Sequence, residues 1–118
     1  MSKYNRGDIL LVPFASTGDN MPSKQRPIVV LSEIALSDGN SELIVAQITG
    51  NVNSQPRKGD FILSRWQDSG LLRPSLIRGR ITTLHSTSVI RQLGSLHKED
   101  LRKMLDAIGS LIGFSTTI

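Results

Sequence analysis

The stretch KQRPIVVLS, residues 24–32, decides the fold. Residues 27–31 form an apolar run whose β-branched centre favours an extended strand. Arg26 stands directly before the proline, at the entrance of this strand. A guanidinium is a planar fork of donors with a permanent charge, a geometry that suits a phosphate. The sequence therefore predicts a buried strand over residues 26–32 that begins with a cation held in place.

Further strands are predicted on both sides, because other short apolar runs are separated by polar segments that contain glycine or proline. The longest of them contains Gly79, where we expect a bend or bulge. The predicted strands cover residues 8–14, 26–32, 43–49, 61–63 and 75–85, and a further short segment follows residue 86. Residues 15–25 and 50–60 are predicted loops, residues 65–74 an irregular or short helical connection, and residues 33–42 a turn region with one helical turn before Asp38.

The end of the chain has a different pattern. In HKEDLRKMLDAIGSLIGF, residues 97–114, apolar residues recur at intervals of three and four, which predicts an amphipathic helix. Glu99 and Asp100 fall in its first turn, where the helix dipole favours acidic side chains. We expect the apolar stripe to pack on the core; it consists of Leu101, Met104, Leu105, Ile108, Leu111 and Ile112.

These elements show no alternation of strand and helix, so the sheet is predicted to be antiparallel and strongly curved. The predicted fold class is mainly β with a C-terminal α-helix, in the form of a small barrel closed by that helix. A chain of 118 residues is long enough to bury a core of its own. We therefore assign residues 1–118 to a single domain.

The composition favours a binding partner with negative charge. The formal net charge is +4 and the sequence pI is about 10.0, a balance that suits nucleic acid, although it also serves plain solubility. The absence of cysteine rules out disulfides and thiol chemistry. There is neither a secretory signal nor a run of about 20 apolar residues, so we expect a cytoplasmic protein with no membrane partner.

Several classes of catalytic site are excluded by the motifs. His85 and His97 have no ligand partners at metal spacing, so we expect both to be surface or capping residues and no metal to be bound. Neither a phosphate-binding glycine loop nor a nucleophile elbow is present. An enzyme with this sequence would have to use arginine, threonine and serine.

Four residues fit that chemistry. Arg26 opens one strand, and Thr49 ends another just before Gly50. Arg78 and Arg80 alternate with apolar residues in the strand over residues 75–85, so both should point to one side. Each position also has an ordinary interpretation, as a solvated loop charge or a turn residue.

Taken together, five segments resemble one family. They are RGDILLVPF at 6–14, KQRPIVVLS at 24–32, AQIT at 46–49, GLLRPSLIRGRITTL at 70–84 and LHKEDLRKM at 96–104. In order and spacing they resemble the MazF/PemK toxins of type II toxin–antitoxin systems, from residue 6 to residue 112. The resemblance implies an SH3-like barrel with a terminal helix, a homodimer, and metal-independent endoribonuclease activity on single-stranded RNA. It further implies inhibition by a cognate antitoxin with an acidic disordered tail. DNA would be bound only indirectly, through that antitoxin.

The resemblance also implies site residues. Arg26 matches the arginine of the family's Arg-Pro motif, Thr49 its threonine, and Arg78 the arginine of the R-x-D stretch in the PemK branch. The aspartate of that stretch is Arg80 here, and the aspartate usual near the end of this strand is His85, so the general base of that branch is missing. We expect RNA contacts from Lys24, Gln25, Asn51, Arg57 and Arg80.

The implied chemistry needs no cofactor, because the nucleophile is the substrate's own 2′-hydroxyl. Arg26 would stabilise the charge that gathers on the phosphorane, Thr49 would hydrogen-bond a non-bridging oxygen, and Arg78 would be a second cation. The products would be a 2′,3′-cyclic phosphate and a 5′-hydroxyl.

Two alternatives keep the fold without the reaction. The related CcdB toxins bind DNA gyrase through a C-terminal Trp-Gly-Ile, whereas this chain ends in GFSTTI and has its single tryptophan at Trp66. A non-catalytic RNA-binding barrel would rely on aromatic stacking, and aromatic residues make up 4% of the chain.

Overall fold

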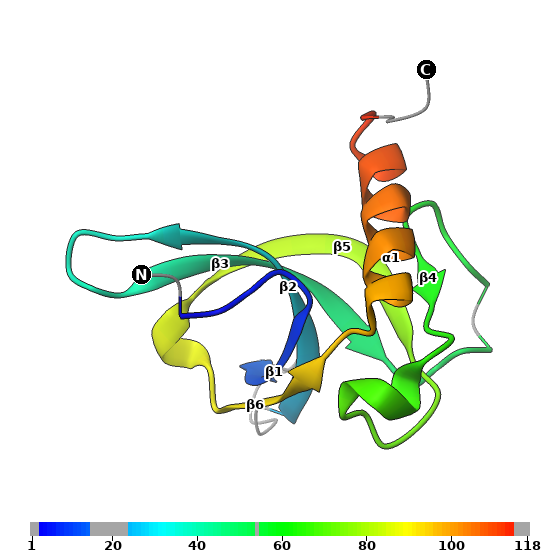
Figure 1. Ribbon diagram of the computed structural model, residues 1–118, viewed down its shortest axis with the longest axis horizontal. Coiled ribbons are helices and arrows are strands. Elements are labelled where there is room, and N and C mark those ends of the chain that lie inside the picture. The colour runs from blue at the N-terminus through cyan, green and yellow to red at the C-terminus, as the bar shows by residue number, and fades with distance from the viewer. Residues whose placement is uncertain (1–2, 15–23, 54, 115–118) are drawn as a thin grey trace, which may run out of the picture.

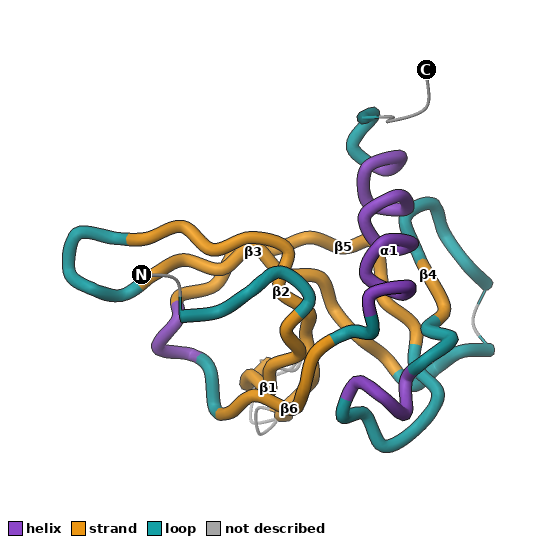
Figure 2. The backbone as a smooth tube through the Cα atoms, viewed as in Figure 1, coloured by secondary structure: helices purple, strands orange, loops and turns teal. Residues whose placement is uncertain are grey.

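The architecture is a curled antiparallel sheet with one helix. A computed structural model describes residues 3–14, 24–53 and 55–114. The strands are β1 (Asp8–Phe14), β2 (Lys24–Ala35), β3 (Ser41–Thr49), β4 (Phe61–Ile62), β5 (Leu76–His85) and β6 (Arg91–Ser95). Two 3-10 turns, η1 (Trp66–Ser69) and η2 (Ser86–Ser88), precede β5 and β6, and the helix α1 (Lys98–Leu111) ends the fold. Figure 2 shows the two turns on opposite sides of β1 and β6.

The sheet has the strand order β4-β5-β3-β2-β1-β6, and every neighbouring pair is antiparallel. It curls into a half-barrel, with α1 standing beside β4 and β5 (Figure 1). The predicted mainly-β fold with a C-terminal helix is therefore confirmed. Among the described residues, no helix has the length and apolar character needed to cross a membrane.

Both faces of the central strands are buried, because alternate residues enter two apolar clusters. One cluster receives Met104 and Ile108 from α1, together with Ile9, Val29 and Ile77 from the strands. The other lies on the opposite face of the strands and consists of Leu10, Val12, Ile28, Val30, Leu43 and Val45. The β-branched run that predicted β2 thus supplies residues to both clusters.

The bend expected near Gly79 is present. Ala46 of β3 lies opposite Ile81, but Ile48 lies opposite Ile77, so β5 contains extra residues between these two pairs. The bulge brings Gly79 against the preceding loop: a Cβ at this position would lie 2.9 Å from backbone atoms of Gly59 and Lys58. Glycine is therefore required where the loop crosses β5.

Two local predictions were wrong. The expected helical turn before Asp38 is a hairpin turn, in which the Leu36 N–H donates to the Asn40 carbonyl at 2.9 Å. The strand predicted over residues 26–32 runs from Lys24 to Ala35. It starts earlier because Lys24 and Gln25 pair with β1, and it ends later because residues 32–35 pair with residues 41–44 of β3. Residues 15–23 of the predicted loop lie outside the described residues.

The helix is placed as predicted, but its buried face is narrower. Met104 and Ile108 are buried, whereas Leu105 is 37% exposed and Ile112 66% exposed. Asp100, in the first turn of the helix, is fully buried. Its carboxylate accepts hydrogen bonds from the Ser64 hydroxyl (2.8 Å) and from the N–H groups of Ser64 and Arg65 (3.2 and 2.8 Å), so it ties the start of α1 to the η1 segment.

Candidate phosphate-binding cleft

A cleft of about 520 Å³ lies where the ends of β2 and β3 meet β6 and the segment before β5. Its polar lining consists of Gln25, Arg26, Thr49, Arg73, Ser75 and Arg91. Strand register explains part of this grouping: Ile28 lies opposite Gln47, so extending the ladder by two residues sets Arg26 opposite Thr49. The structure thus brings together the two residues that the Arg-Pro motif and the strand end had singled out.

The cleft is strongly cationic. Arg26 comes from β2, Arg73 from the segment between η1 and β5, and Arg91 from the start of β6. Within the described part of the chain, none of the three side chains forms an ion pair or a hydrogen bond, and no carboxylate lines the cleft. Like charges that line one cleft without counter-charges favour an anionic ligand.

The Thr49 hydroxyl is oriented by its neighbour. The Asn51 N–H donates to Thr49 Oγ1 at 3.2 Å, which occupies one of the acceptor sites of the hydroxyl oxygen. The hydroxyl hydrogen is then directed to a different acceptor. A non-bridging phosphate oxygen in the cleft would be such an acceptor.

Sequence reasoning missed Arg73 and Arg91. Arg73 repeats the Arg-Pro dipeptide seen at Arg26, since Pro74 follows it, and this repetition was a usable signal. Arg91 had no local signal. It reaches the cleft because β6 pairs with β1, where Arg91 lies opposite Leu11, and Leu11 lies opposite Pro27 on its other side.

Arg78 does not line this cleft. Its Nη1 atom lies 2.8 Å from Oδ2 of Asp60, whose side chain is 2% exposed. Asp60 also accepts hydrogen bonds from the N–H groups of Arg57 (2.8 Å) and Gly79 (2.9 Å). Burial alone raises the pKa of the Asp60 carboxyl, but the hydrogen bonds and the Arg78 charge outweigh burial and leave that pKa below its usual value.

The other residues expected to bind RNA lie around the cleft or away from it. Gln25 lines it, and Lys24 is exposed beside it at the start of β2. Asn51, Arg57 and Arg80 are exposed outside the lining. The two histidines are capping residues, as expected: His85 Nδ1 accepts from the Thr87 N–H, and His97 Nδ1 accepts from the Glu99 N–H.

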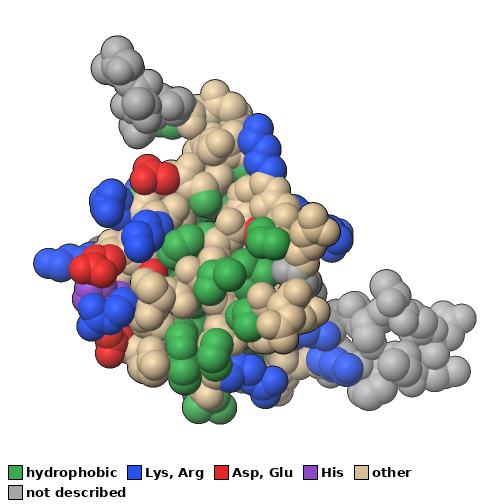
Figure 3. Space-filling model, turned by 90° about the vertical axis from the view of Figure 1, so that its right-hand side faces the viewer, with side chains coloured by type: hydrophobic (Ala, Val, Ile, Leu, Met, Phe, Trp, Pro, Cys, Tyr) green, Lys and Arg blue, Asp and Glu red, His purple; other side chains and the backbone are tan. Residues whose placement is uncertain are grey.

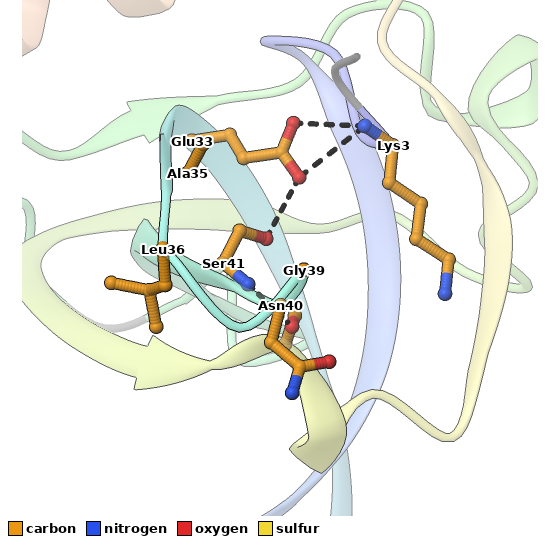
Figure 4. A pocket seen from close by; sticks show the side chains of 8 residues that line it. Lys3, Glu33, Ala35, Leu36, Gly39, Asn40 and Ser41 are labelled. Atoms are coloured by element: carbon orange, nitrogen blue, oxygen red, sulfur yellow. Dashed lines mark hydrogen bonds between the residues drawn. The ribbon is translucent and has the colours of Figure 1, made fainter.

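A second hollow, of about 380 Å³, lies at the β2–β3 hairpin (Figure 4). Its central group is the Glu33 carboxylate, which accepts hydrogen bonds from the Lys3 N–H (3.0 Å) and the Ser41 hydroxyl (2.8 Å). Figure 4 shows this carboxylate joining the N-terminal segment to the hairpin. A carboxylate at the centre makes the hollow unsuited to a polyanion.

Comparisons with known proteins agree with the fold. The model of the PemK-like, MazF-like toxins of type II toxin–antitoxin systems matches residues 5–112. A MazE–MazF crystal structure from Deinococcus radiodurans is similar with a TM-score of 0.71 and 16% identity, over 98% of this chain and 100% of that chain. The sequence gives no match among curated proteins.

Two mycobacterial structures are also similar. The Mycobacterium tuberculosis toxin MazF-mt6 gives a TM-score of 0.69 at 20% identity, over 92% of this chain and 98% of that chain. An endoribonuclease in complex with its cognate antitoxin, from a mycobacterial species, gives a TM-score of 0.68 at 15% identity, over 92% of this chain and 93% of that chain. At such identities the similarity shows a shared fold.

Proposed function

The chain belongs to the PemK-like, MazF-like toxins of type II toxin–antitoxin systems, and from this premise we propose that it is a metal-independent endoribonuclease that cuts single-stranded RNA. One observation carries the proposal: Arg26 and Thr49 meet at two strand ends inside a cleft lined by arginines and, among the described residues, by no carboxylate. RNA offers this cleft a row of phosphates, each beside a 2′-hydroxyl that can act as the nucleophile.

In the proposed reaction, the 2′-oxygen forms a bond to the adjacent phosphorus while the bond from phosphorus to the 5′-oxygen breaks. The 2′-hydroxyl proton leaves to a base, and the departing 5′-oxygen takes up a proton. The products are a 2′,3′-cyclic phosphate and a 5′-hydroxyl. The nucleophile belongs to the substrate, so neither a metal nor a cofactor has to generate it.

The residues of the cleft contribute mainly by stabilising charge. Arg26 lies where it can neutralise the negative charge that grows on the phosphorane, and the Thr49 hydroxyl can donate to a non-bridging oxygen. A guanidinium gives up its proton too reluctantly to be an effective acid. We therefore assign Arg26 an electrostatic role. Arg78, tied to Asp60, would contribute by holding the loop after Thr49 against β5.

The partners follow from the same surface. We propose that a cognate antitoxin inhibits the protein by laying an acidic segment over Arg26, so that antitoxin and RNA compete. DNA would be reached only through that antitoxin. We place the protein in the cytoplasm, where both RNA and antitoxin are found.

We further propose a homodimer. α1 and β4 contact each other. Ile62 of β4 is 52% exposed, Leu105 of α1 is 37% exposed, and Ile112, just after the helix, is 66% exposed. Figure 3 shows hydrophobic side chains gathered on this side of the molecule, with Lys and Arg side chains around them. A patch of this kind is typical of a protein interface. Light scattering should give the mass of a dimer, and Ile62→Asp should reduce it.

The test is cleavage of a mixed single-stranded RNA in EDTA. We expect wild-type protein to cut it and to leave 2′,3′-cyclic phosphate ends, and Arg26→Ala or Thr49→Val to lower the rate by about 10²–10³-fold. Arg102→Ala, an exposed cation on α1, is the matched control and should cut normally. RNA that is bound but not cut would replace this proposal with a non-catalytic RNA-binding barrel.

A further inference from the structure

We infer that Arg73 and Arg91 bind phosphates on either side of the one held by Arg26 and Thr49, and that Gly50 is glycine because the stem of Arg73 lies across it. The inference rests on the proposed function and deepens it. It assigns RNA-backbone contacts to residues that sequence reasoning had left without a role.

The backbone of Arg73 is anchored by its surroundings, and its side chain passes over Gly50. The Ser75 hydroxyl donates to the Arg73 carbonyl at 2.9 Å, and Ser75 itself is 3% exposed, so the backbone before β5 is anchored. A Cβ added to Gly50 would lie 2.6 Å from Cδ of Arg73 and 3.4 Å from its Cγ. The aliphatic stem of Arg73 therefore crosses the residue that follows Thr49, and its guanidinium is carried along the Thr49 side of the cleft.

Arg91 enters from the other side. It lies opposite Leu11 of β1, and Leu11 lies opposite Pro27 of β2, so one strand separates Arg91 from the Arg26–Pro27 pair. Neighbouring strands are about 4.8 Å apart, which puts the backbone of Arg91 roughly 10 Å from that of Pro27. The backbone positions that carry the cations are thus spaced along the cleft, and we infer that the charges follow this spacing.

This spread selects the class of ligand. A single phosphate would be held best by guanidinium groups that converge on it, whereas a row of cations fits a chain of phosphates. The cleft also has an apolar edge, because Leu72 is 95% exposed next to Arg73. A single-stranded nucleic acid offers both phosphates and bases, so it matches the cleft better than a small anion.

Salt dependence of binding tests the inference independently of cleavage. The probe is a short RNA that is 2′-O-methylated throughout and so cannot be cut by its own 2′-hydroxyls. Removal of one cation that binds a phosphate should reduce the slope of log K against log salt by about 0.7 for a single strand. We expect this reduction for Arg73→Ala and for Arg91→Ala, and no change for Arg102→Ala.

Gly50→Ala is the most specific variant. Gly50 has no left-handed backbone angle, and the atoms that a methyl group would meet belong to a movable side chain, so the fold should tolerate alanine. The displacement of Arg73 should reduce the slope by the same amount, about 0.7. Combining Gly50→Ala with Arg73→Ala should reduce it no further than Arg73→Ala alone, because both changes act on the same cation. Unchanged thermal melting would show that the fold survives.

The outcomes separate the two proposals. If Arg73→Ala and Arg91→Ala bind the probe with the wild-type slope while wild-type protein still cuts RNA, the inference is wrong and the proposed function stands. If the slopes fall as expected but wild-type protein does not cut unmodified RNA, the inference stands and the proposed function fails. If wild-type protein cuts RNA without binding the probe, the inference is wrong, and if it neither binds the probe nor cuts unmodified RNA, both are overturned.

Discussion

Arginine occurs in two contrasting environments in this molecule. In the cleft, Arg26, Arg73 and Arg91 are without ion-pair partners among the described residues. At the β5 bulge, Arg78 is 16% exposed and its guanidinium lies against the buried Asp60 carboxylate. The first group keeps its charge available for a ligand, whereas Arg78 uses its charge to hold the loop over residues 57–60 on the sheet.

The difference has an energetic basis. Removing one partner of a buried ion pair leaves an uncompensated charge, which is costly. Removing an exposed cation changes stability little, because water solvates it equally well in the unfolded chain. Substitutions in the cleft should therefore lower activity and leave the free energy of unfolding nearly unchanged. Substitutions of the buried pair at the bulge should lower the free energy of unfolding.

The largest effect is expected for activity at the cleft. Arg26→Ala should lower RNA cleavage by about 10²–10³-fold, while its free energy of unfolding stays within about 0.5 kcal/mol of wild type. Cleavage rates and urea unfolding, measured on the same preparation, check both halves. A large loss of stability would mean that Arg26 belongs with Arg78 as a structural cation.

The next effect concerns stability at the bulge. Asp60→Ala should lower the free energy of unfolding by about 3 kcal/mol, because it leaves the Arg78 guanidinium without its carboxylate and two N–H groups without an acceptor. Urea unfolding of wild type and Asp60→Ala measures this difference in the free energy of unfolding.

Asp68→Ala is the matched control for this stability effect. It removes the exposed Arg65–Asp68 pair, whose side chains are 45% and 47% exposed, and should cost at most about 1 kcal/mol. Equal destabilisation by the two substitutions would contradict the distinction between the buried and the exposed pair.

A smaller effect is expected from pH. The pKa of Asp60 is lower in the folded protein than its ordinary value of 3.8, so the ionised carboxylate stabilises the fold above that value. The stabilisation is lost as the pH falls through the folded-state pKa. The stability advantage of wild type over Asp60→Asn should thus be constant from pH 7 down to about 5 and should shrink below about 4. A constant advantage down to pH 2 would show that the charge of Asp60 is irrelevant.

The smallest effect is expected at Arg80, which is exposed on β5 and lies outside the cleft lining. Arg80→Ala should weaken RNA binding slightly and mainly at low salt, through the loss of long-range attraction. Its stability should match wild type within about 0.5 kcal/mol. Competition binding at two salt concentrations checks this. If Arg80→Ala weakened binding as much as Arg73→Ala, Arg80 would also have to contact an RNA phosphate.

Much of the fold could be predicted because local sequence determines it. The β-branched run after Arg26, the spacing of Met104 and Ile108, and the glycine of the β5 bulge each specify their own structure. The limits of β2 were wrong because pairing with β1 extends its start and pairing with β3 extends its end. The partial exposure of Leu105 could not be foreseen, since helical periodicity does not tell how wide a face the sheet covers.

Only part of the candidate site could be predicted from the sequence. Arg26 and Thr49 lie at strand ends that the motifs mark. Arg91 reaches them through the β1–β6 pairing, and the carboxylate beside Arg78 comes from a loop and not from position 80. Both relations join segments that are distant along the chain, and no local pattern encodes them.

The β1–β6 pairing also sets the order in which the protein can be completed during its own synthesis. The Ser95 hydroxyl bonds the Asp8 carboxylate across 87 positions of the chain, and Leu96 N–H bonds the Gly7 carbonyl. Contacts so distant form late, because the intervening chain must first be made and closed into a loop. β1 keeps an unpaired edge until β6 has left the ribosome, and Arg91 arrives with β6. On the proposed function, a growing chain therefore lacks its full RNA-binding cleft while it is still attached to the message that encodes it.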